Sequence, residues 1–320
     1  MDIYFFETFE EEAKLHGEML GNQYTFECSS GTIQEIGHTE PPARLISIRT
    51  QSNIPVDWAD KIDGVLSRTT GYDHLIAYRA SIKRTLPLGF LEEYATRAVA
   101  EHAILLVMAL LRRLPRQLSQ FPSFNREGLT GVECEGKNLL VVGVGRIGSE
   151  IVMLARSLGF VVRGVDIKPD KSDVTYVSKQ EGVPWADVIV CAMNLTAENK
   201  GYFSHKLMRR AKKGCHLVNI ARGEHTPLAD MECLLHDGHL AGLGLDVFED
   251  EGDLAVSLRS RGIESSPHGA ILRRILTYPN VVLTPHNAFN SSEALRRKSA
   301  MTVEQIQHFF KHRDFKWKVE

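Results

Sequence analysis

The chain has 320 residues, which exceeds the usual size of one domain and favours two domains over a small binding module. Hydrophobic residues make up 43% and charged residues 24%, a composition that excludes collagenous, low-complexity and disordered chains. The net charge of -2 offers no general attraction to nucleic acid or to anionic lipid. We therefore expect a small-molecule partner, with no nucleic acid and no membrane.

Three features favour a cytoplasmic protein. The longest apolar run, residues 103–111, is about half of the roughly 20 residues needed to cross a bilayer. The first residues turn acidic and lack the basic and apolar regions of a secretory signal. The five cysteines are an odd number without a C-x-x-C pair, which favours thiols in a reducing compartment over a disulfide framework.

The first hundred residues have weak hydrophobic patterning. Strand-like runs occupy residues 31–36 and 45–49, and prolines mark turns nearby. We interpret this region as a separate α/β domain.

A helix is predicted at residues 98–114, where the chain is apolar nearly all round from residue 103 to residue 111. Such a helix is tolerated only when it is buried on most sides. We expect it to join the two domains and to contact a second subunit, which makes a homodimer the expected assembly.

From residue 138 onward, short β-rich runs alternate with helical patterns, as in βαβ units with a parallel sheet. Apolar residues recur every three or four positions from Ile147 to Leu158, which predicts an amphipathic helix that stops at Gly159. These runs predict a doubly wound parallel sheet. Its strands are expected at residues 138–142, 161–166, 188–192, 216–220, 242–246 and 281–284.

The chain is expected to end in a helix. Ser291 and Ser292 are candidate N-caps, and Val303, Ile306 and Phe310 follow at helical spacing. This helix would pack back on the first domain, so that the second domain is an insertion.

A glycine motif stands between the first strand of the sheet and its helix. The segment Gly143-Val144-Gly145-Arg146-Ile147-Gly148 matches G-x-G-x-x-G, the dinucleotide-binding pattern. Gly143 would permit the turn, Gly145 would let the backbone approach a pyrophosphate, and Gly148 would allow helix and strand to pack closely.

An acid follows the glycine motif at the spacing that dinucleotide binding needs. The next strand ends at Asp166, whose carboxylate can accept hydrogen bonds from the ribose hydroxyls and would repel a 2′-phosphate. NAD is therefore the expected cofactor, a preference that the nearby Arg163 and Lys168 weaken.

Three later segments each place polar residues where a predicted strand ends, which is where doubly wound sheets bind ligands. Together with the glycine motif they resemble the D-isomer-specific 2-hydroxyacid dehydrogenases, from about Ser67 to about Ala294. The long insert after Glu251 and the sequence His286-x-Ala288-Phe289 look most like the D-lactate dehydrogenase branch. The segments are Asn219-Ile220-Ala221-Arg222-Gly223, residues 244–251, and Thr284-Pro285-His286-Asn287-Ala288-Phe289.

The resemblance implies a fold and a reaction. A Rossmann cofactor domain, residues 101–290, would be inserted in a smaller flavodoxin-like α/β substrate domain formed by residues 1–100 and 291–320. The reaction would be a reversible hydride transfer between NADH and a small 2-keto acid such as pyruvate.

The resemblance also implies roles for five residues of the cofactor domain. Arg222 would bind the substrate carboxylate through its planar guanidinium. His286 would protonate the keto oxygen, or accept the hydroxyl proton in the reverse direction, and Glu251 would orient the imidazole and favour its protonated form. Asp246 would hydrogen-bond the nicotinamide carboxamide, and Ala221 would lie at the cofactor.

Other residues resemble the family's substrate contacts. Thr70 and Gly71 match a loop whose backbone N–H groups receive the substrate carboxylate. Tyr94 stands where the D-lactate branch has a substrate-contacting tyrosine, although Ala95 and Thr96 replace its usual Ser-Pro neighbours. Phe289 would line the pocket.

Two further patterns are interpreted as structural. Cys233, His236 and His239 spell C-x-x-H-x-x-H, which could supply three zinc ligands. A helix followed by a turn would leave both histidines on a surface corner, so no metal is expected. The basic runs at residues 209–213 and 296–298 are expected to be solvated helix faces.

Two alternative functions share these sequence features. Transcriptional corepressors related to this family keep the cofactor fold but use NAD binding to control assembly. A dehydrogenase of the same fold could instead act on phosphite or on a phosphorylated hydroxy acid. The lack of a marked basic cluster beside Thr70 argues against a phosphorylated substrate, although Arg79, Lys83 and Arg84 could lie nearby.

Overall fold

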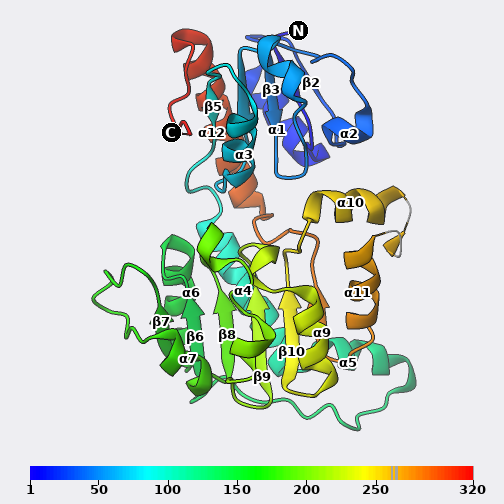
Figure 1. Ribbon diagram of the computed structural model, residues 1–320, viewed down its shortest axis with the longest axis vertical. Helices are drawn as coiled ribbons and strands as arrows, with labels where there is room; N and C mark the ends of the chain where they lie inside the picture. Colours follow the sequence, from blue (N-terminus) through cyan, green and yellow to red (C-terminus); the bar gives the residue numbers. More distant parts are fainter. Residues whose placement is uncertain (261, 264–265, 320) are drawn as a thin grey trace. The chain divides into compact units, whose positions relative to one another are not determined.

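A computed structural model describes residues 1–260, 262–263 and 266–319. The chain forms two compact units, which we call unit 1 (Met1–Ala95 with Asn290–Glu320) and unit 2 (Thr96–Phe289) (Figure 1). The predicted boundary at residue 100 falls inside helix α4 (Thr96–Leu111), whereas the structure assigns this helix whole to unit 2.

Unit 1 is built on a parallel sheet with five strands in the described residues. The strand order β2-β1-β3-β4-β5 is that of flavodoxin-like domains. Its strands are β1 (Ile3–Phe5), β2 (Phe26–Cys28), β3 (Leu45–Ile48), β4 (Gly64–Ser67) and β5 (Leu88–Gly89). Its helices are α1 (Glu10–Leu20), α2 (Ile33–Ile36), η1 (Val56–Asp60), α3 (Asp73–Ser81) and α12 (Ser292–His312).

The strand predicted at residues 31–36 is wrong, because this segment contains helix α2. Thr32 Oγ1 accepts a hydrogen bond from Glu35 N at 3.2 Å, and Glu35 Oε2 accepts one from Thr32 N at 2.9 Å. This reciprocal capping box satisfies amide groups that a helix start would otherwise leave unpaired. The strand predicted at residues 45–49 is confirmed as β3.

Helix α12 packs in unit 1, as the sequence predicts. The Ser291 hydroxyl accepts a hydrogen bond from Ala294 N and caps the helix. The helix contacts α1, and the Phe310 ring stacks on Tyr24 with ring centroids 4.7 Å apart. One prediction for this helix is wrong: in the basic run 296–298, Lys298 is completely buried.

The basic run at residues 209–213 differs from its prediction in another way. Four of its residues are exposed, but the run forms turns after α8 (His205–Met208) and is not helical.

Unit 2 is built on a parallel sheet with six strands in the described residues, in the order β11-β10-β9-β8-β6-β7. Each of the six predicted strands is confirmed, with ends shifted by no more than two residues. Beyond β7, Gly164 forms a single parallel bridge with Tyr176, at the place where the Rossmann order has a further strand. The strands are β6 (Asn138–Val142), β7 (Val161–Val165), β8 (Val188–Cys191), β9 (Cys215–Asn219), β10 (Leu240–Leu245) and β11 (Val281–Leu283).

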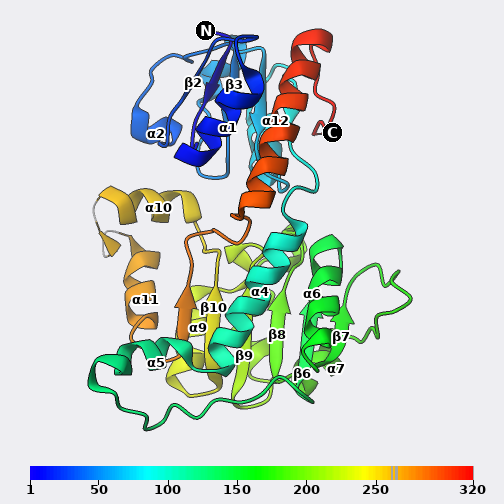
Figure 2. The same cartoon turned by 180° about the vertical axis from the view of Figure 1, so that it is seen from behind.

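Helices cover both faces of this sheet, so it is doubly wound. Helices α4 and α6 pack together on one face (Figure 2), and α9 covers the other (Figure 1). The remaining helices of unit 2 complete the two layers or connect strands. The helices are α5 (Leu114–Gln120), η2 (Phe121–Ser123), α6 (Arg146–Ser157), α7 (Lys179–Trp185), η3 (Ala197–Asn199), α8, η4 (Gly223–His225), α9 (Leu228–His236), α10 (Glu251–Ser260) and α11 (Pro267–Ile275).

All five cysteines lie in described residues and are free thiols. Cys191 and Cys215 are buried in β8 and β9, and burial raises the pKa of each thiol to about 12. Neither is therefore a nucleophile at neutral pH. Within the described part of the chain, every helix is too short or too polar to span a bilayer.

Candidate active site

The glycine motif forms the turn from β6 into α6. Gly143 has a φ of +91°, and a side chain there would lie 2.5 Å from the Met193 backbone. A side chain at Gly148 would lie 2.0 Å from the Gly143 carbonyl oxygen. Both positions therefore require glycine, one for the turn and one for the close packing of helix on strand.

Gly145 differs from the other two glycines. It caps helix α6, and a side chain at this position would meet no atom within 4 Å. Open space therefore lies in front of the helix N-terminus, where backbone N–H groups and the helix dipole favour an anion. Arg146 and Ile147 begin the helix beside this space. The loop has the form that a dinucleotide pyrophosphate needs.

Asp166 follows β7 and is held against the glycine loop. Its Oδ2 accepts a hydrogen bond from Val144 N at 2.6 Å, and its Oδ1 accepts one from Lys168 N at 2.7 Å. The carboxylate keeps further lone pairs for ribose hydroxyls. Arg163 is engaged elsewhere, since its guanidinium lies 4.4 Å from the centre of the Trp185 ring.

His286 and Glu251 form a close pair at the carboxyl edge of the sheet. The imidazole Nδ1 lies 2.6 Å from the Glu251 Oε1, and the side chains are 22% and 19% exposed. Glu251 begins α10, and His286 lies in the loop after β11. Because Nδ1 faces the carboxylate, Nε2 is the nitrogen that can exchange a proton with a substrate.

The loop that carries His286 wraps around the buried carboxylate of Asp246. The oxygens of Asp246 accept hydrogen bonds from Thr284 Oγ1 at 2.5 Å, Asn287 N at 2.8 Å and Ala288 N at 2.9 Å. His286 N donates to the Asp246 carbonyl at 2.8 Å. Successive N–H groups of this kind form a concave site for a carboxylate. The structure thus gives Asp246 a positioning contact that sequence reasoning missed.

Arg222 lies in the loop that follows β9. The Asn219 side chain shapes this loop, because its Nδ2 donates to Arg222 O at 2.8 Å and its Oδ1 accepts from Ala221 N at 3.0 Å. A side chain at Gly223 would overlap the Phe248 backbone at 1.8 Å, so the loops after β9 and β10 touch at this glycine. The packing leaves Arg222 partly buried.

The strand order explains why residues far apart in the sequence share one edge. All six strands of unit 2 that the structure describes are parallel, so their carboxyl ends lie on the same side. The glycine loop follows β6, Arg222 follows β9, Asp246 follows β10 and His286 follows β11. Ligands of doubly wound sheets bind along this edge.

The predicted substrate residues are divided between the units. Thr70 and Gly71 follow β4 in unit 1, where Thr70 Oγ1 donates to Glu92 O at 2.6 Å and Thr69 Oγ1 donates to Gly71 O at 2.8 Å. Tyr94 also belongs to unit 1 and is buried, with its carbonyl accepting a hydrogen bond from Arg297. Phe289 is buried at the end of unit 2.

The C-x-x-H-x-x-H pattern does not form a metal site. Cys233 is exposed on α9, and His239 is buried with its Nε2 2.8 Å from Met208 O. The prediction that both histidines lie on a surface corner is therefore wrong for His239, because the chain turns inward to enter β10. The described residues contain no group of three or more metal-ligating side chains.

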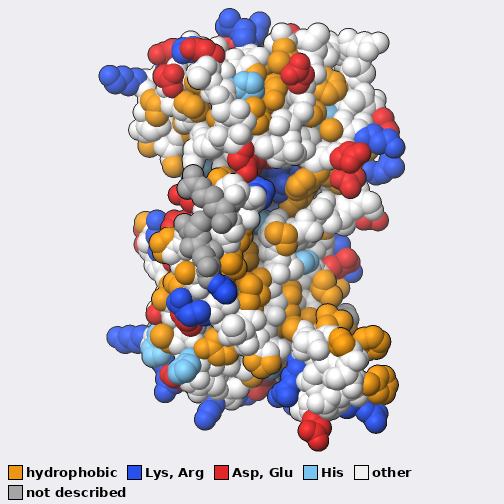
Figure 3. Space-filling view, turned by 90° about the vertical axis from the view of Figure 1, so that its right-hand side faces the viewer, with side chains coloured by type: hydrophobic (Ala, Val, Ile, Leu, Met, Phe, Trp, Pro, Cys, Tyr) orange, Lys and Arg blue, Asp and Glu red, His pale blue; other side chains and the backbone are white. Residues whose placement is uncertain are grey.

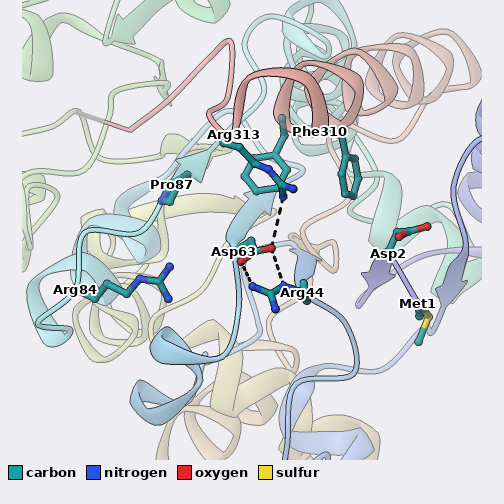
Figure 4. A pocket seen from close by; sticks show the side chains of 9 residues that line it. Met1, Asp2, Arg44, Asp63, Arg84, Pro87, Phe310 and Arg313 are labelled. Carbon is teal, nitrogen blue, oxygen red and sulfur yellow. Dashed lines mark hydrogen bonds and ion pairs between the residues drawn. The ribbon is translucent and has the colours of Figure 1, made fainter.

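A cavity of about 520 Å³ in unit 1 lies at the opposite edge of its sheet (Figure 4). It is lined by Asp2, Asp63 and Pro87, which stand just before β1, β4 and β5. The guanidinium groups of Arg44 and Arg313 share the Asp63 carboxylate at 2.6 and 3.6 Å. We do not place the active site here, since this is the amino edge of the sheet.

The chain is similar to known proteins of one family. Residues 104–288, more than half of the chain, match the family model of the D-isomer specific 2-hydroxyacid dehydrogenase NAD-binding domain. The D-lactate dehydrogenase of Escherichia coli (strain K12) is 32% identical over 227 residues, which is 68% of this chain and 67% of that protein. The D-3-phosphoglycerate dehydrogenase of Bacillus subtilis (strain 168) is 32% identical over 223 residues, 68% of this chain but only 39% of that longer protein.

The fold is similar to that of solved D-lactate dehydrogenase structures. The crystal structure of D-lactate dehydrogenase from Aquifex aeolicus, complexed with NAD and lactic acid, superposes with a TM-score of 0.84. The sequence identity is 24%, and the match covers 97% of this chain and 96% of that one. With the nucleotide loop in place and a family match over more than half of the sequence, the chain belongs to the D-isomer specific 2-hydroxyacid dehydrogenases, which are NAD-dependent oxidoreductases.

Proposed function

We propose that the enzyme reduces a small 2-keto acid of the pyruvate type, or oxidises the corresponding D-2-hydroxy acid. The observation that carries the proposal is the 2.6 Å contact between His286 Nδ1 and Glu251 Oε1, on the sheet edge that also holds the glycine loop and Arg222. Bound NADH would supply the hydride for the reduction.

The proton has a defined route in this proposal. His286 donates a proton from Nε2 to the keto oxygen as it becomes a hydroxyl, and takes it back in the reverse reaction. Glu251 holds the ring through Nδ1 and stabilises the imidazolium form. Positioned acid–base catalysis of this kind contributes about 10² to 10⁴ in rate.

Arg222 binds the substrate carboxylate in this proposal. A guanidinium presents paired N–H donors that match the two carboxylate oxygens, and each hydrogen bond to a charged group contributes roughly 1.5 to 3 kcal/mol. In unit 1, Thr70 and Gly71 offer backbone N–H groups to the same anion. Tyr94 and Phe289 shape the apolar part of the pocket.

The cofactor-binding residues contact three parts of the cofactor, namely the pyrophosphate, the ribose and the nicotinamide. The glycine loop, Gly143 to Gly148, binds the pyrophosphate, and Asp166 accepts hydrogen bonds from the ribose hydroxyls. Ala221 lies beside the cofactor. Asp246 forms a hydrogen bond with the nicotinamide carboxamide, and it also accepts hydrogen bonds from the loop that carries His286.

A phosphorylated substrate is less well supported. Arg79 donates to Val319 O, and Arg84 lines the cavity at the amino edge of the sheet, away from the loop after β4. The basic residues Arg68 and Lys298, in the same unit as Thr70, are completely buried and share the Glu12 carboxylate, so they present no exposed basic cluster to a phosphate. Phosphorylated 2-keto acids nevertheless belong in the substrate panel, because the Bacillus subtilis relative is a D-3-phosphoglycerate dehydrogenase.

We also propose that two copies of the chain form a homodimer through unit 2. Exposed hydrophobic side chains recur from α4 through α5 to η2, with exposed fractions between 40% and 76%. In Figure 3, which shows one face, exposed hydrophobic side chains are scattered among charged and polar ones. Apolar surface of this extent is typical of an interface. The residues are Leu105, Leu114, Leu118, Phe121 and Phe124.

The decisive experiment follows NADH oxidation with a panel of 2-keto acids, first in the wild type and then in His286→Ala. We expect turnover in the variant to fall by at least about 10², because proton transfer is lost, while NADH still binds as measured by fluorescence titration. His236→Ala is the matched control, since this histidine is exposed on α9. Full turnover in His286→Ala would refute the mechanism.

The panel also separates the alternatives. If NADH binds tightly but none of the keto acids is reduced, a regulatory NAD-binding protein becomes the better explanation. A preference for phosphite or for a phosphorylated acid would replace the proposed substrate class.

A further inference from the structure

A group of charged side chains lies completely buried in unit 1, and one of them directly precedes the loop that contains Thr70 and Gly71. Glu12 comes from α1, Arg68 directly follows β4, and Lys298 comes from α12. All three have no exposed surface. Arg68 Nε and Lys298 Nζ lie 2.9 and 2.8 Å from the same oxygen of Glu12. We call these three residues the buried ion group.

The ionic state of the group follows from its contacts. Burial acts to raise the pKa of Glu12, but Lys298 and Arg68 outweigh this effect and hold the pKa well below its usual value. Glu12 is therefore a carboxylate at every working pH. Burial lowers the pKa of Lys298 to about 7, although Glu12 acts to raise it, so Lys298 is protonated in only part of the molecules at neutral pH. His16 lies 3.9 Å from the same oxygen and stays neutral, since burial lowers its pKa to about 3.

Arg68 connects the carboxyl ends of three neighbouring strands. Its guanidinium donates to Phe6 O at 2.7 Å and to Glu7 O at 3.1 Å, just after β1, and to Ser47 Oγ at 2.9 Å in β3. Its own backbone N–H donates to Ile48 O at 2.9 Å. One residue at the end of β4 is thus fixed to β3 and to the segment that follows β1.

The contacts continue from Arg68 into the loop. Ser67 Oγ lies 2.6 Å from Thr69 Oγ1, which donates in turn to Gly71 O at 2.8 Å. Leu91 N donates to Thr69 O at 3.0 Å on the other side. The backbone from Arg68 to Gly71 is therefore held on both flanks.

Stability alone does not explain the buried ion group. Replacing a buried ion pair by apolar side chains of similar volume is often neutral or stabilising, because the charges lose their hydration when they are buried. What apolar side chains cannot supply is direction, since hydrogen bonds fix the orientation of a backbone and dispersion contacts do not.

We propose that Glu12, Arg68 and Lys298 are positioning residues, which hold the loop after β4 in the conformation that receives the substrate carboxylate. The inference rests on the proposed function for the role of Thr70 and Gly71. The three residues do not touch the substrate themselves. They act by fixing the backbone from Arg68 to Gly71.

The test replaces all three side chains of the buried ion group together. The triple variant Glu12→Leu, Arg68→Met and Lys298→Met removes all three ions at similar volume, so we expect it to fold. The control is Arg44→Met with Asp63→Asn, which removes the ionic contacts of Asp63 with Arg44 and Arg313 at the opposite ends of β3 and β4. Circular dichroism and the unfolding midpoint confirm that each variant is folded.

Two measurements follow on the folded proteins. Amide hydrogen exchange of the triple variant should become faster in the peptides that contain residue 68 and Leu91, whose N–H groups donate to Ile48 O and Thr69 O in the wild type, and remain unchanged in the peptide with the glycine motif. In steady-state kinetics, KM for the 2-keto acid should rise by about tenfold or more while KM for NADH stays within about twofold, because a misplaced loop loses substrate geometry. The control variant should show neither change.

The outcomes are distinguishable. Unchanged exchange in the triple variant overturns the inference, as does an equal rise of the keto-acid KM in the control variant. If the triple variant fails to fold, Lys298→Met alone, which leaves the neutral pair of Glu12 and Arg68, is examined by the same exchange measurement with the same criteria. Faster loop exchange supports the positioning role even if the wild type reduces no keto acid, a result that would refute only the proposed function.

Discussion

His286, the proton donor in our proposal, shows how the fold fixes the orientation of one side chain. Its φ of +49° lies in the left-handed region, which costs a non-glycine residue of the order of 1 to 3 kcal/mol. The Asp246 carboxylate and carbonyl offset this cost by accepting hydrogen bonds from the N–H groups of residues 286–288. The strained backbone then places Nδ1 against Glu251. The orientation of the imidazole is therefore set by contacts within the chain itself.

We expect one residue, Asp166, to influence the choice between NADH and NADPH. Asp166→Ala should narrow the preference for NADH over NADPH, because the carboxylate that repels a 2′-phosphate is removed. The measurement is the ratio of kcat/KM for the two cofactors. Asp170→Ala is the control, since Asp170 is exposed four residues further along the chain. An unchanged ratio in Asp166→Ala would show that this residue does not face the ribose.

Helix α12 shows how one element serves two purposes. Its first turn is capped by Ser291, and its buried face carries both apolar residues and Lys298. Because the cap lies just after the chain leaves unit 2, it also fixes the point where the chain returns to unit 1. The same helix thus completes the core of unit 1 and supplies one cation of the buried ion group.

Removal of this cap should destabilise unit 1. We expect Ser291→Ala to lower the free energy of unfolding by about 1 kcal/mol, since one N–H group at the helix start loses its acceptor. Urea unfolding followed by tryptophan fluorescence reports mainly on unit 1, which contains Trp58 and Trp317, two of the three tryptophans of the chain. Ser291→Asn keeps an acceptor and should stay close to the wild type. Equal destabilisation by both substitutions would contradict the capping role.

At the scale of the whole molecule, the chain forms two parallel α/β units, and the sequence of unit 2 is inserted between the two segments of unit 1. The two crossings fall at residues 95–96 and 289–290, and each unit has its own parallel sheet. In both sheets, the loops that we propose to bind ligands follow the carboxyl ends of strands. The apolar surface that remains exposed on α4, α5 and η2 is the part that we assign to the partner copy.

This assignment predicts the effect of charge on assembly. Leu118→Glu and Phe121→Glu should each shift the protein from dimer to monomer in sedimentation velocity, because a charge in an apolar interface is desolvated without a partner. Met153→Glu is the control, since Met153 is an exposed apolar residue on α6 outside the patch. A wild-type monomer, or dimers that persist in both variants, would refute the proposed interface.

Local sequence patterns predict much of the cofactor-binding unit. The alternation of β-rich runs with helical periodicity predicts the six strands of unit 2. Strands that are buried on both faces have short, almost continuous apolar sequences, which makes them easy to recognise. The G-x-G-x-x-G motif locates the nucleotide loop, because the backbone turn and the close packing of helix on strand require its glycines. The same kind of pattern is misleading at residues 31–36, where capping by Thr32 and Glu35 overrides β propensity.

Only the tertiary structure decided which polar residues are buried together. Lys298 lies in a basic run that the sequence presents as solvated, and its partner Glu12 lies near the other end of the chain, so no local pattern links them. Asp246 likewise shows its contacts with the His286 loop only once β10 and β11 are neighbours. Sequence by itself determined the fold class, the nucleotide loop and the family, because these depend on periodicity and short motifs. The buried ion group and the carboxylate that holds His286 depend on which distant segments meet, and only packing in three dimensions settles that.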